Sequence, residues 1–360
     1  MGGWMVILHF AEYASGGIAT YLKNLIASQV KRKDVKRVYL LVSEYNSDAA
    51  LLNMKDNKLT VLEYKYKRSA FGVLKLLRLS SIINKINPDV IHIHSSFAGI
   101  VRLKYLFSNR KKSIVYCSHG WAFNREISTW KKAVYKFIEL ILSAGCNRII
   151  NISKFEQNSA KFISPKKMFT IYNSIPPRNK SLNTKSHRGL DLVFIGRLDR
   201  QKGIDLLISA MHAVNHDGYL NLTVVGDSIV DPIVRKHNTK SIKFLGWQNS
   251  KQVQSIIETG DVLVVPSRWE GFGLVSLEAM SVGKMVVASD AGALPEIVLN
   301  RKTGLIFKAN SGNALANVLE DLQKMPKDMI ENLGEQGEKR YYTSFSYPKM
   351  VDEVMAVYSK

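Results

Sequence analysis

The sequence alternates short apolar runs with segments of helical periodicity, and it does so in two series that a polar stretch separates. In the first series, Val90–His94 and residues 114–118 read as strands, and residues 130–144 read as a helix. The alternation starts again at Leu190–Ile195. Such alternation is typical of a parallel sheet with crossover helices. The chain is therefore predicted to be α/β, with two doubly wound Rossmann-like domains facing each other across a cleft.

The polar stretch sets the expected domain boundaries. After Ile175-Pro176-Pro177 the chain is polar up to residue 188, and 360 residues exceed the usual size of one core. We expect a first domain at 1–175, a linker at 176–188 and a second domain at 189–342. The tail at 343–360 is helix-like and follows the second sheet, so we expect it to pack back on the first domain.

The cysteine content, the hydropathy and the first residues indicate the cellular compartment in which the protein is expected. The two cysteines, Cys117 and Cys146, fit a reducing environment and offer no zinc-ligand pattern. No apolar run approaches the roughly 20 residues that span a bilayer. Residues 1–10 read as a strand rather than a signal peptide, so we expect a cytoplasmic protein.

The net charge of +21 is unevenly distributed. Residues 1–180 contain 30 basic and 10 acidic side chains, whereas the second half contains 21 and 20. This asymmetry predicts a polyanionic partner for the first half, either nucleic acid or an anionic membrane surface.

Two acids frame a glycine-containing turn in the second half. Glu270 lies on a loop after a strand-like run, and Glu278 lies on the helix that the loop opens. Gly271 and Gly273 allow unusual dihedral angles, and the amides of residues 272–274 have no intrahelical partner. A polyhydroxylated or phosphorylated ligand suits such a turn. The alternative is an ordinary strand-turn-helix with solvated acids.

Polar groups also follow other strands. Arg197 and Lys202 flank a turn after the first strand of the second domain, where a pyrophosphate can bind, although a charged surface turn is the alternative. His119 ends a strand of the first domain. The pair Gly16-Gly17 opens a helix there, as a phosphate or sugar cradle or as a simple turn. Gly246 and Trp247 end a strand and suit the floor and wall of a base pocket.

These motifs carry a resemblance to a known family. The second half contains Gly-Arg-Leu at 196–198 and, after three residues, Lys-Gly at 202–203. It also contains Pro-Ser at 266–267, Glu-Gly-Phe-Gly-Leu at 270–274 and Glu-Ala at 278–279. This combination of motifs resembles glycosyltransferase family 4. The resemblance covers most of residues 190–310 and is looser in the first half, where it rests on Gly16-Gly17, residues 88–92, His119 and residues 172–176. It implies the GT-B fold, a nucleotide-sugar donor and a retaining mechanism.

The resemblance also implies roles for single residues. Arg197 and Lys202 are expected to neutralise the donor diphosphate and the charge that develops as the nucleotide leaves. Glu270 is expected to bond hydroxyls of the donor sugar, helped by the turn residues Gly271, Phe272, Gly273 and Leu274. Glu278 is expected to bind the ribose, His119 to contact the sugar, and Gly17 to let the first domain approach the phosphates.

The donor is expected to be a uridine diphosphate sugar first and a guanosine diphosphate sugar second, carrying a hexose or N-acetylhexosamine that is transferred with an α linkage. The sequence contains no Asp-x-Asp motif, so we expect no metal and no cofactor, with Arg197 and Lys202 in the cation's role.

The acceptor side is expected in the basic first half. The resemblance implies a lipid-linked glycan acceptor in surface polysaccharide synthesis, of the O-antigen or capsule type. Three segments of this half mix cations with bulky apolar groups. They are residues 71–79, residues 102–107 and the helix with Trp130, Lys131, Lys132, Lys136 and Phe137. That mixture suits an anionic bilayer, so we expect peripheral association with the inner face of the cell membrane. Amphipathic helices with outward lysines are the alternative.

The residues alone leave other functional classes of protein possible. A basic nucleic-acid-binding protein also fits the charge, but no recognition motif supports it and no nucleic acid is expected. A nucleotide-sugar epimerase or a glycan phosphorylase can use the same scaffold. A nicotinamide oxidoreductase is disfavoured because Gly16-Gly17 lacks the Gly-x-Gly-x-x-Gly fingerprint.

Overall fold

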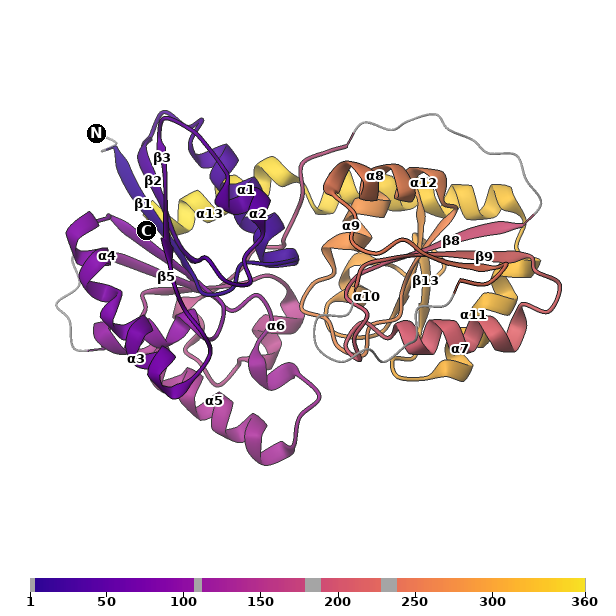
Figure 1. Ribbon diagram of the computed structural model, residues 1–360, viewed down its shortest axis with the longest axis horizontal. Coiled ribbons are helices and arrows are strands. Elements are labelled where there is room, and N and C mark those ends of the chain that lie inside the picture. Colours follow the sequence, from indigo (N-terminus) through magenta and orange to yellow (C-terminus); the bar gives the residue numbers. More distant parts are fainter. Residues whose placement is uncertain (1–3, 107–111, 179–188, 228–237, 360) are drawn as a thin grey trace. The chain divides into compact units, whose positions relative to one another are not determined.

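The computed structural model describes residues 4–106, 112–178, 189–227 and 238–359. The chain divides into two compact units, residues 1–175 with 347–360 and residues 176–346 (Figure 1). The expected linker lies largely at 179–188, outside the described residues. The last helix, Tyr347–Ser359, belongs to the first unit.

The first unit contains a seven-stranded sheet whose described pairings are all parallel, in the order β3-β2-β1-β4-β5-β6-β7. Helices α1 and α13 lie on one side of this sheet, and α3 and α4 lie on the other (Figure 1). The strands are β1 (Met5–Ala11), β2 (Val35–Ser43), β3 (Leu59–Tyr64), β4 (Val90–His94), β5 (Ser113–Cys117), β6 (Arg148–Asn151) and β7 (Met168–Thr170). The α-helices are α1 (Gly17–Gln29), α2 (Ala49–Leu52), α3 (Ala70–Arg78), α4 (Ser80–Ile86), α5 (Thr129–Ser143), α6 (Lys154–Ser159) and α13 (Tyr347–Ser359); the 3₁₀ helices are η1 (Ala98–Tyr105), η2 (Ala122–Asn124) and η3 (Pro165–Lys167).

The second unit contains a six-stranded parallel sheet in the order β10-β9-β8-β11-β12-β13. Helices α7 and α11 cover one side of it, and α8 lies on the other (Figure 1). The strands are β8 (Leu190–Ile195), β9 (Leu220–Val225), β10 (Ile242–Phe244), β11 (Val262–Val265), β12 (Met285–Ser289) and β13 (Gly304–Phe307). The helices are α7 (Ile204–Val214), α8 (Ser250–Thr259), α9 (Leu274–Met280), α10 (Leu294–Ile297), α11 (Gly312–Lys324) and α12 (Lys327–Ser344).

Local sequence explains these elements. Strand β11 is four consecutive β-branched or leucine residues, and all four are buried, as expected for a central parallel strand covered on both faces. Helix α11 begins where the Ser311 hydroxyl accepts from the amide of Ala314. Its leucines, Leu315, Leu319 and Leu322, are buried in the same core as Ile204 and Leu207 of α7.

In both sheets the order in which strands are added along the chain reverses at a central pair of strands. This switch point lies between β1 and β4 in the first unit and between β8 and β11 in the second. Ligands of doubly wound sheets bind beyond the carboxyl ends of the strands at such a point. The prediction of two doubly wound α/β domains is confirmed. Among the described residues, no helix is long and apolar enough to cross a bilayer.

Candidate functional site

Lys202 and Glu270 meet at the switch point of the second sheet. Lys202 follows β8, Glu270 follows the neighbouring β11, and the Lys202 Nζ lies 2.5 Å from Glu270 Oε2. The lysine side chain is 21% exposed and the glutamate side chain is 9% exposed. The structure therefore brings together two of the predicted site residues, as an ion pair with an accessible cation.

Two glycines permit this approach of the loops. Gly203 has φ +69°, and a Cβ there would lie 2.0 Å from the carbonyl oxygen of Pro266. Gly292 has φ +59°, and a Cβ there would lie 1.8 Å from the carbonyl oxygen of Glu270. No side chain fits at either position. The loops after β8, β11 and β12 are thus packed backbone to backbone around Glu270.

Serines fix the Glu270 carboxylate from the other side. The Ser267 hydroxyl donates to Glu270 Oε2 at 3.2 Å. The Ser289 hydroxyl in turn donates to the carbonyl of Ser267 at 2.6 Å. Both serines are buried, so the carboxylate is oriented by groups that have little freedom to move.

Arg197 is held beside this pair by its own partners. Its Nε lies 3.0 Å from Asp199 Oδ2, and its Nη2 donates to Gln201 Oε1 at 2.8 Å. The Gln201 amide then donates to the carbonyl of Trp269 at 3.2 Å. The arginine side chain remains 42% exposed. A diphosphate that binds Arg197 therefore has to compete with Asp199, which the sequence did not indicate.

A buried arginine ties the same two loops together. Arg268 forms a double ion pair with Asp205, with N–O distances of 2.8 and 2.6 Å. Its backbone amide donates to the carbonyl of Gln201 at 2.8 Å. This bidentate pair joins the β11 loop to the first turn of α7, and it is a positioning element that sequence reasoning missed.

Glu278 lies on α9 as predicted, but it has a charged partner. Arg178 Nη2 lies 3.2 Å from Glu278 Oε1, and both side chains are mostly buried. Burial raises the pKa of Glu278, and the nearby Arg178 opposes that shift. Its expected role in ribose binding stays a prediction, and Arg178 is an additional residue of this side of the site.

The turn between the acids is only partly as expected. Gly273 has φ +97° and is the residue from which α9 starts at Leu274. Gly271 is not among the residues with positive φ. Phe272 is buried and its ring centroid lies 6.1 Å from that of Phe345. The side chain of Phe272 is thus a packing group.

The expected base pocket is not delimited by the described residues. Gly246 has φ +69°, and its carbonyl accepts from the amide of Gly226 at 2.9 Å. Trp247 is 60% exposed. Residues 228–237, which follow Gly226-Asp227, lie outside the described part of the chain. The role of Gly246 and Trp247 therefore stays a prediction.

The predicted residues of the first unit lie at the carboxyl ends of its strands. Gly16 has φ +55°, and a Cβ there would meet nothing within 4 Å. Gly17 is the first residue of α1. His119 follows β5 and has φ +52°, unusual for a residue other than glycine. Its Nε2 lies 2.9 Å from Nδ1 of His94.

His94 belongs to a buried cluster that the sequence only hinted at. His92 and His94 alternate on β4, and His9 of β1 pairs with His92 in register. All three are completely buried. Their ligating atoms lie within 4.8 Å of one another, a grouping that can accept a metal ion. The His-x-His pattern placed two rings on one face, but nothing local indicated His9.

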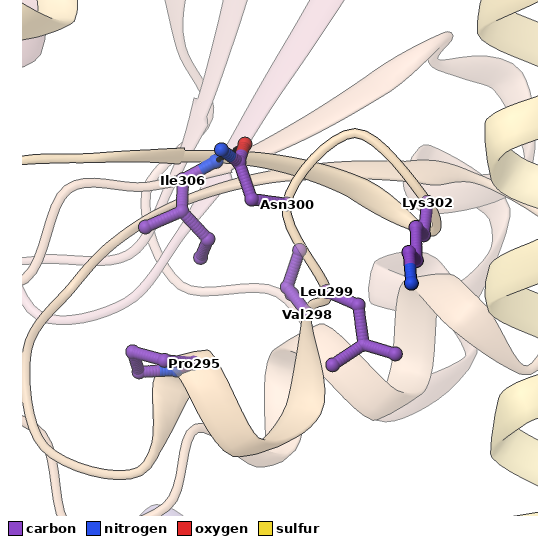
Figure 2. Close-up of a pocket in the computed structure, with 6 residues that line it drawn as sticks. All are labelled: Pro295, Val298, Leu299, Asn300, Lys302 and Ile306. Carbon is purple, nitrogen blue, oxygen red and sulfur yellow. Dashed lines mark hydrogen bonds between the residues drawn. The ribbon is translucent and has the colours of Figure 1, made fainter.

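A shallow hollow of about 330 Å³ lies elsewhere on the second unit. It is lined by Pro295, Val298, Leu299, Asn300, Lys302 and Ile306 (Figure 2). None of the predicted site residues contributes to it, and its single charged group, Lys302, has no acid beside it in the lining. We assign no function to this hollow.

The chain thus has two doubly wound parallel sheets, with an ion pair at the switch point of the second. The chain is similar to sucrose-phosphate synthase from Thermosynechococcus elongatus, with a TM-score of 0.81, 18% identity and coverage of 99% of this chain and 98% of that one. The fold is therefore GT-B.

Sequence comparison gives the family. Residues 178–340 match the family described as glycosyl transferases group 1, and residues 15–179 match glycosyltransferase family 4. The chain belongs to glycosyltransferase family 4.

Two similar proteins indicate the biosynthetic process to which the family relatives belong. An uncharacterized 41.2 kDa protein in the cps region of Klebsiella pneumoniae is 29% identical over 88% of this chain and 89% of the relative. The UDP-Gal:alpha-D-GlcNAc-diphosphoundecaprenol alpha-1,3-galactosyltransferase of Escherichia coli is 25% identical over 79% of this chain and 78% of that protein. These similarities are consistent with surface polysaccharide synthesis.

Proposed function

We propose that this transferase moves a hexose or N-acetylhexosamine from a nucleotide diphosphate sugar to a sugar hydroxyl of a lipid-linked glycan, with retention and an α linkage. The observation that carries the proposal is the Lys202–Glu270 pair at the β8/β11 switch point. It offers a cation for a diphosphate and a carboxylate for sugar hydroxyls within one ion pair.

The chemistry requires such an arrangement. As the glycosidic bond to the nucleotide breaks, positive charge develops on the sugar and negative charge on the departing diphosphate. Cations that are already oriented stabilise that negative charge without reorganisation. Lys202 is fixed by Glu270, and Arg197 is fixed by Asp199 and Gln201. With these two cations the proposed reaction proceeds without a metal ion.

The relatives guide the choice of substrates. The Escherichia coli relative is named for a UDP-galactose donor and a diphosphoundecaprenol-linked acceptor. We therefore favour a UDP-sugar over a GDP-sugar and a lipid-linked acceptor for this chain. The product would be a surface polysaccharide of the O-antigen or capsule type.

We further propose that the protein works at the cytoplasmic membrane face and contacts it through α5. Trp130, Val134, Phe137 and Ile141 recur along one stripe of this helix, and all four are exposed, Trp130 by 65% and Phe137 by 64%. On the opposite side of the helix, buried Glu139 pairs with Arg102 at 2.6 Å. That ion pair anchors the helix with its apolar stripe outward.

Charge supports a lipid partner for this stripe. Lys131, Lys132 and Lys136 lie on the same helix, and residues 1–180 carry a net charge of +20. Apolar side chains flanked by lysines suit the boundary between headgroups and acyl chains of an anionic bilayer.

A panel of donors tests the proposal directly. The full-length protein is heated with UDP-, GDP- and ADP-sugars, and a true donor at a hundred times its Kd should add about 2.7 kcal/mol to the unfolding free energy. The stabilising donor is then incubated with a lipid-linked disaccharide, with and without EDTA. We expect nucleotide release that depends on acceptor and resists EDTA.

Other outcomes would contradict the proposal. An altered nucleotide sugar formed without an acceptor indicates an epimerase. A reaction that requires orthophosphate indicates a phosphorylase. The absence of stabilisation by every nucleotide sugar would remove the donor site itself.

A further inference from the structure

A chain of hydrogen bonds runs through the interior of the first unit from α1 to the loop after β5. Gln29 Oε1 lies 2.7 Å from His9 Nε2. His9 Nδ1 lies 3.0 Å from His94 Nε2. His94 Nδ1 lies 2.9 Å from His119 Nε2. Two rings, those of His9 and His94, therefore connect a buried carboxamide to the partly exposed His119, through atoms that alternate regularly between Nε2 and Nδ1.

The orientation of Gln29 sets the direction of this chain. Its amide nitrogen faces the hydroxyl of Tyr358 at 3.5 Å and the sulfur of Met355 at 3.8 Å, both on α13. The sulfur has no proton to donate, and the hydroxyl can accept while its own proton faces Nδ1 of His92, 2.6 Å away. The amide nitrogen therefore faces α13, and the carboxamide oxygen is turned toward His9. A carbonyl oxygen only accepts. The proton of His9 therefore lies on Nε2.

The remaining protons follow from the one on His9. A neutral imidazole has one donor and one acceptor, so His9 Nδ1 accepts from His94 Nε2–H. His94 Nδ1 then accepts from His119 Nε2–H. The proton of His119 points into the protein, and its Nδ1 carries a lone pair.

The N···N contacts themselves require neutral rings, because two N–H groups cannot bond to each other and each contact joins one protonated and one unprotonated nitrogen. A ring that accepts at one nitrogen and donates at the other carries a single proton. The Tyr21 ring packs edge-on against His119 with centroids 4.8 Å apart, which limits rotation of the imidazole.

We propose that Gln29 is a positioning residue: through His9 and His94 it holds His119 as the Nε2–H tautomer, so that Nδ1 accepts a hydroxyl of the donor sugar. Within the described residues, no group bonds to that nitrogen. The inference rests on the proposed function for the identity of the ligand, a sugar hydroxyl. The tautomer follows from the orientation of the Gln29 carboxamide and does not depend on the ligand.

The proposal has a sharp alternative within the same contacts. If the Gln29 carboxamide were turned around, its N–H would donate to His9 and every proton in the chain would move to the other nitrogen. His119 would then present Nδ1–H, a donor, to the sugar. Because the two arrangements differ at every ring nitrogen, they are distinguishable by spectroscopy.

Nitrogen NMR of the full-length protein, labelled with ¹⁵N at histidine, tests the tautomer without any substrate. Long-range ¹H–¹⁵N correlations distinguish protonated from unprotonated ring nitrogens, and the His119 signals are assigned by their loss in His119→Ala. We expect His119 with Nδ1 unprotonated and Nε2 protonated at neutral pH. Protonated Nδ1 in the wild-type protein overturns the proposal, whatever the variants do.

A second arm removes the carboxamide. Gln29→Met preserves side-chain length but replaces the carboxamide oxygen with a thioether sulfur, a much weaker acceptor, so His9 and His119 should show mixed tautomers. Turnover with the donor found above should fall about tenfold in kcat/KM, the effect of one hydrogen bond. Gln323→Met is the control, because Gln323 is a partly buried glutamine of the second unit whose amide donates to a backbone carbonyl, that of Val214. Equal tautomers and rates in Gln29→Met and wild type would contradict the proposal.

The outcomes separate this inference from the proposed function. If no donor is used but wild-type His119 is the Nε2–H tautomer and changes in Gln29→Met, the positioning role of Gln29 is supported and the proposed transferase function is contradicted. If transfer occurs but His119 is the Nδ1–H tautomer, the function is supported and the positioning role is contradicted. Joint displacement of the His9, His92 and His94 signals by EDTA or by stoichiometric Zn²⁺ would show a metal site in place of the hydrogen-bond chain.

Discussion

Lys202 is the side chain on which the proposed chemistry depends most directly. Lys202→Ala and Glu270→Ala should each reduce transfer by at least about a hundredfold, because each removes a preorganised group from the developing charge. Lys308→Ala is the matched control, since Lys308 also pairs with an acid, Asp290, but is 78% exposed. Donor turnover and thermal unfolding are measured for all three. Near-normal turnover in Lys202→Ala would remove the site assignment.

Glu156 makes the first unit sensitive to pH. Its carboxylate is buried below the loop that carries His119, where it accepts from the amide of Ile152 at 3.0 Å and the hydroxyl of Ser118 at 3.4 Å. Burial raises its pKa from 4.5 to about 7. Between these values the folded protein holds a proton that the unfolded chain has released, so this stabilisation is complete below pH 4.5 and is lost as the pH rises through 7.

The expected size of this effect is about 3 kcal/mol across that interval, from 1.36 kcal/mol per pKa unit. Urea unfolding of wild type and Glu156→Gln at several pH values measures it, because the glutamine does not titrate. The free energy of unfolding of the wild type should fall relative to that of the variant between pH 4.5 and 7. Parallel pH curves would contradict the prediction.

Helix α5 carries the exposed apolar stripe that we propose contacts the membrane. Burying one large apolar side chain contributes roughly 1.5–3 kcal/mol, so the double change Trp130→Ser and Phe137→Ser should weaken binding to anionic liposomes more than tenfold. The pair Met329→Ser and Tyr342→Ser is the control, since both residues are about half exposed on α12. Flotation at moderate salt gives the readout. Wild-type protein that remains in the soluble fraction would contradict the membrane proposal.

Helix α13 connects the end of the chain to the fold of the first unit. Its Tyr347 hydroxyl donates to the carbonyl of Asn24 at 2.6 Å, and its buried side chains include Val354, Met355 and Tyr358. Several buried side chains of this size match the stability of a typical domain. A chain ending at Ser346 should therefore lose hydrogen-exchange protection in residues 4–175 and retain it in residues 189–346. Unchanged protection of the first unit would contradict this expectation.

The sequence predicted the class of fold because its signal is local. Strands such as Val262–Val265 and helices such as Ile204–Val214 are recognisable within a few residues, and their alternation permits few topologies. The positions of Lys202 and Glu270 just after strands followed from the same pattern. The rule that parallel strands end at one edge of a sheet placed both near a common site.

The interaction partners of the predicted residues could not be predicted from the sequence. Lys202 and Glu270 are 68 positions apart, and their ion pair depends on β8 and β11 being neighbours, which the order of strands along the chain does not state. Arg178 beside Glu278 was missed for the same reason. Both Gly271 and Gly273 were expected to allow unusual dihedral angles, and of the two only Gly273 has a positive φ.

By itself, then, the sequence determined two doubly wound domains, a basic first half and a family signature at the strand ends, because periodicity, composition and short motifs are carried by adjacent residues. Only the tertiary structure decided which of those residues touch. His9, Gln29 and Tyr358 come from β1, α1 and α13, and their contact spans more than 300 positions of the chain. Packing of distant elements against one sheet brings such groups together, and no local pattern records it.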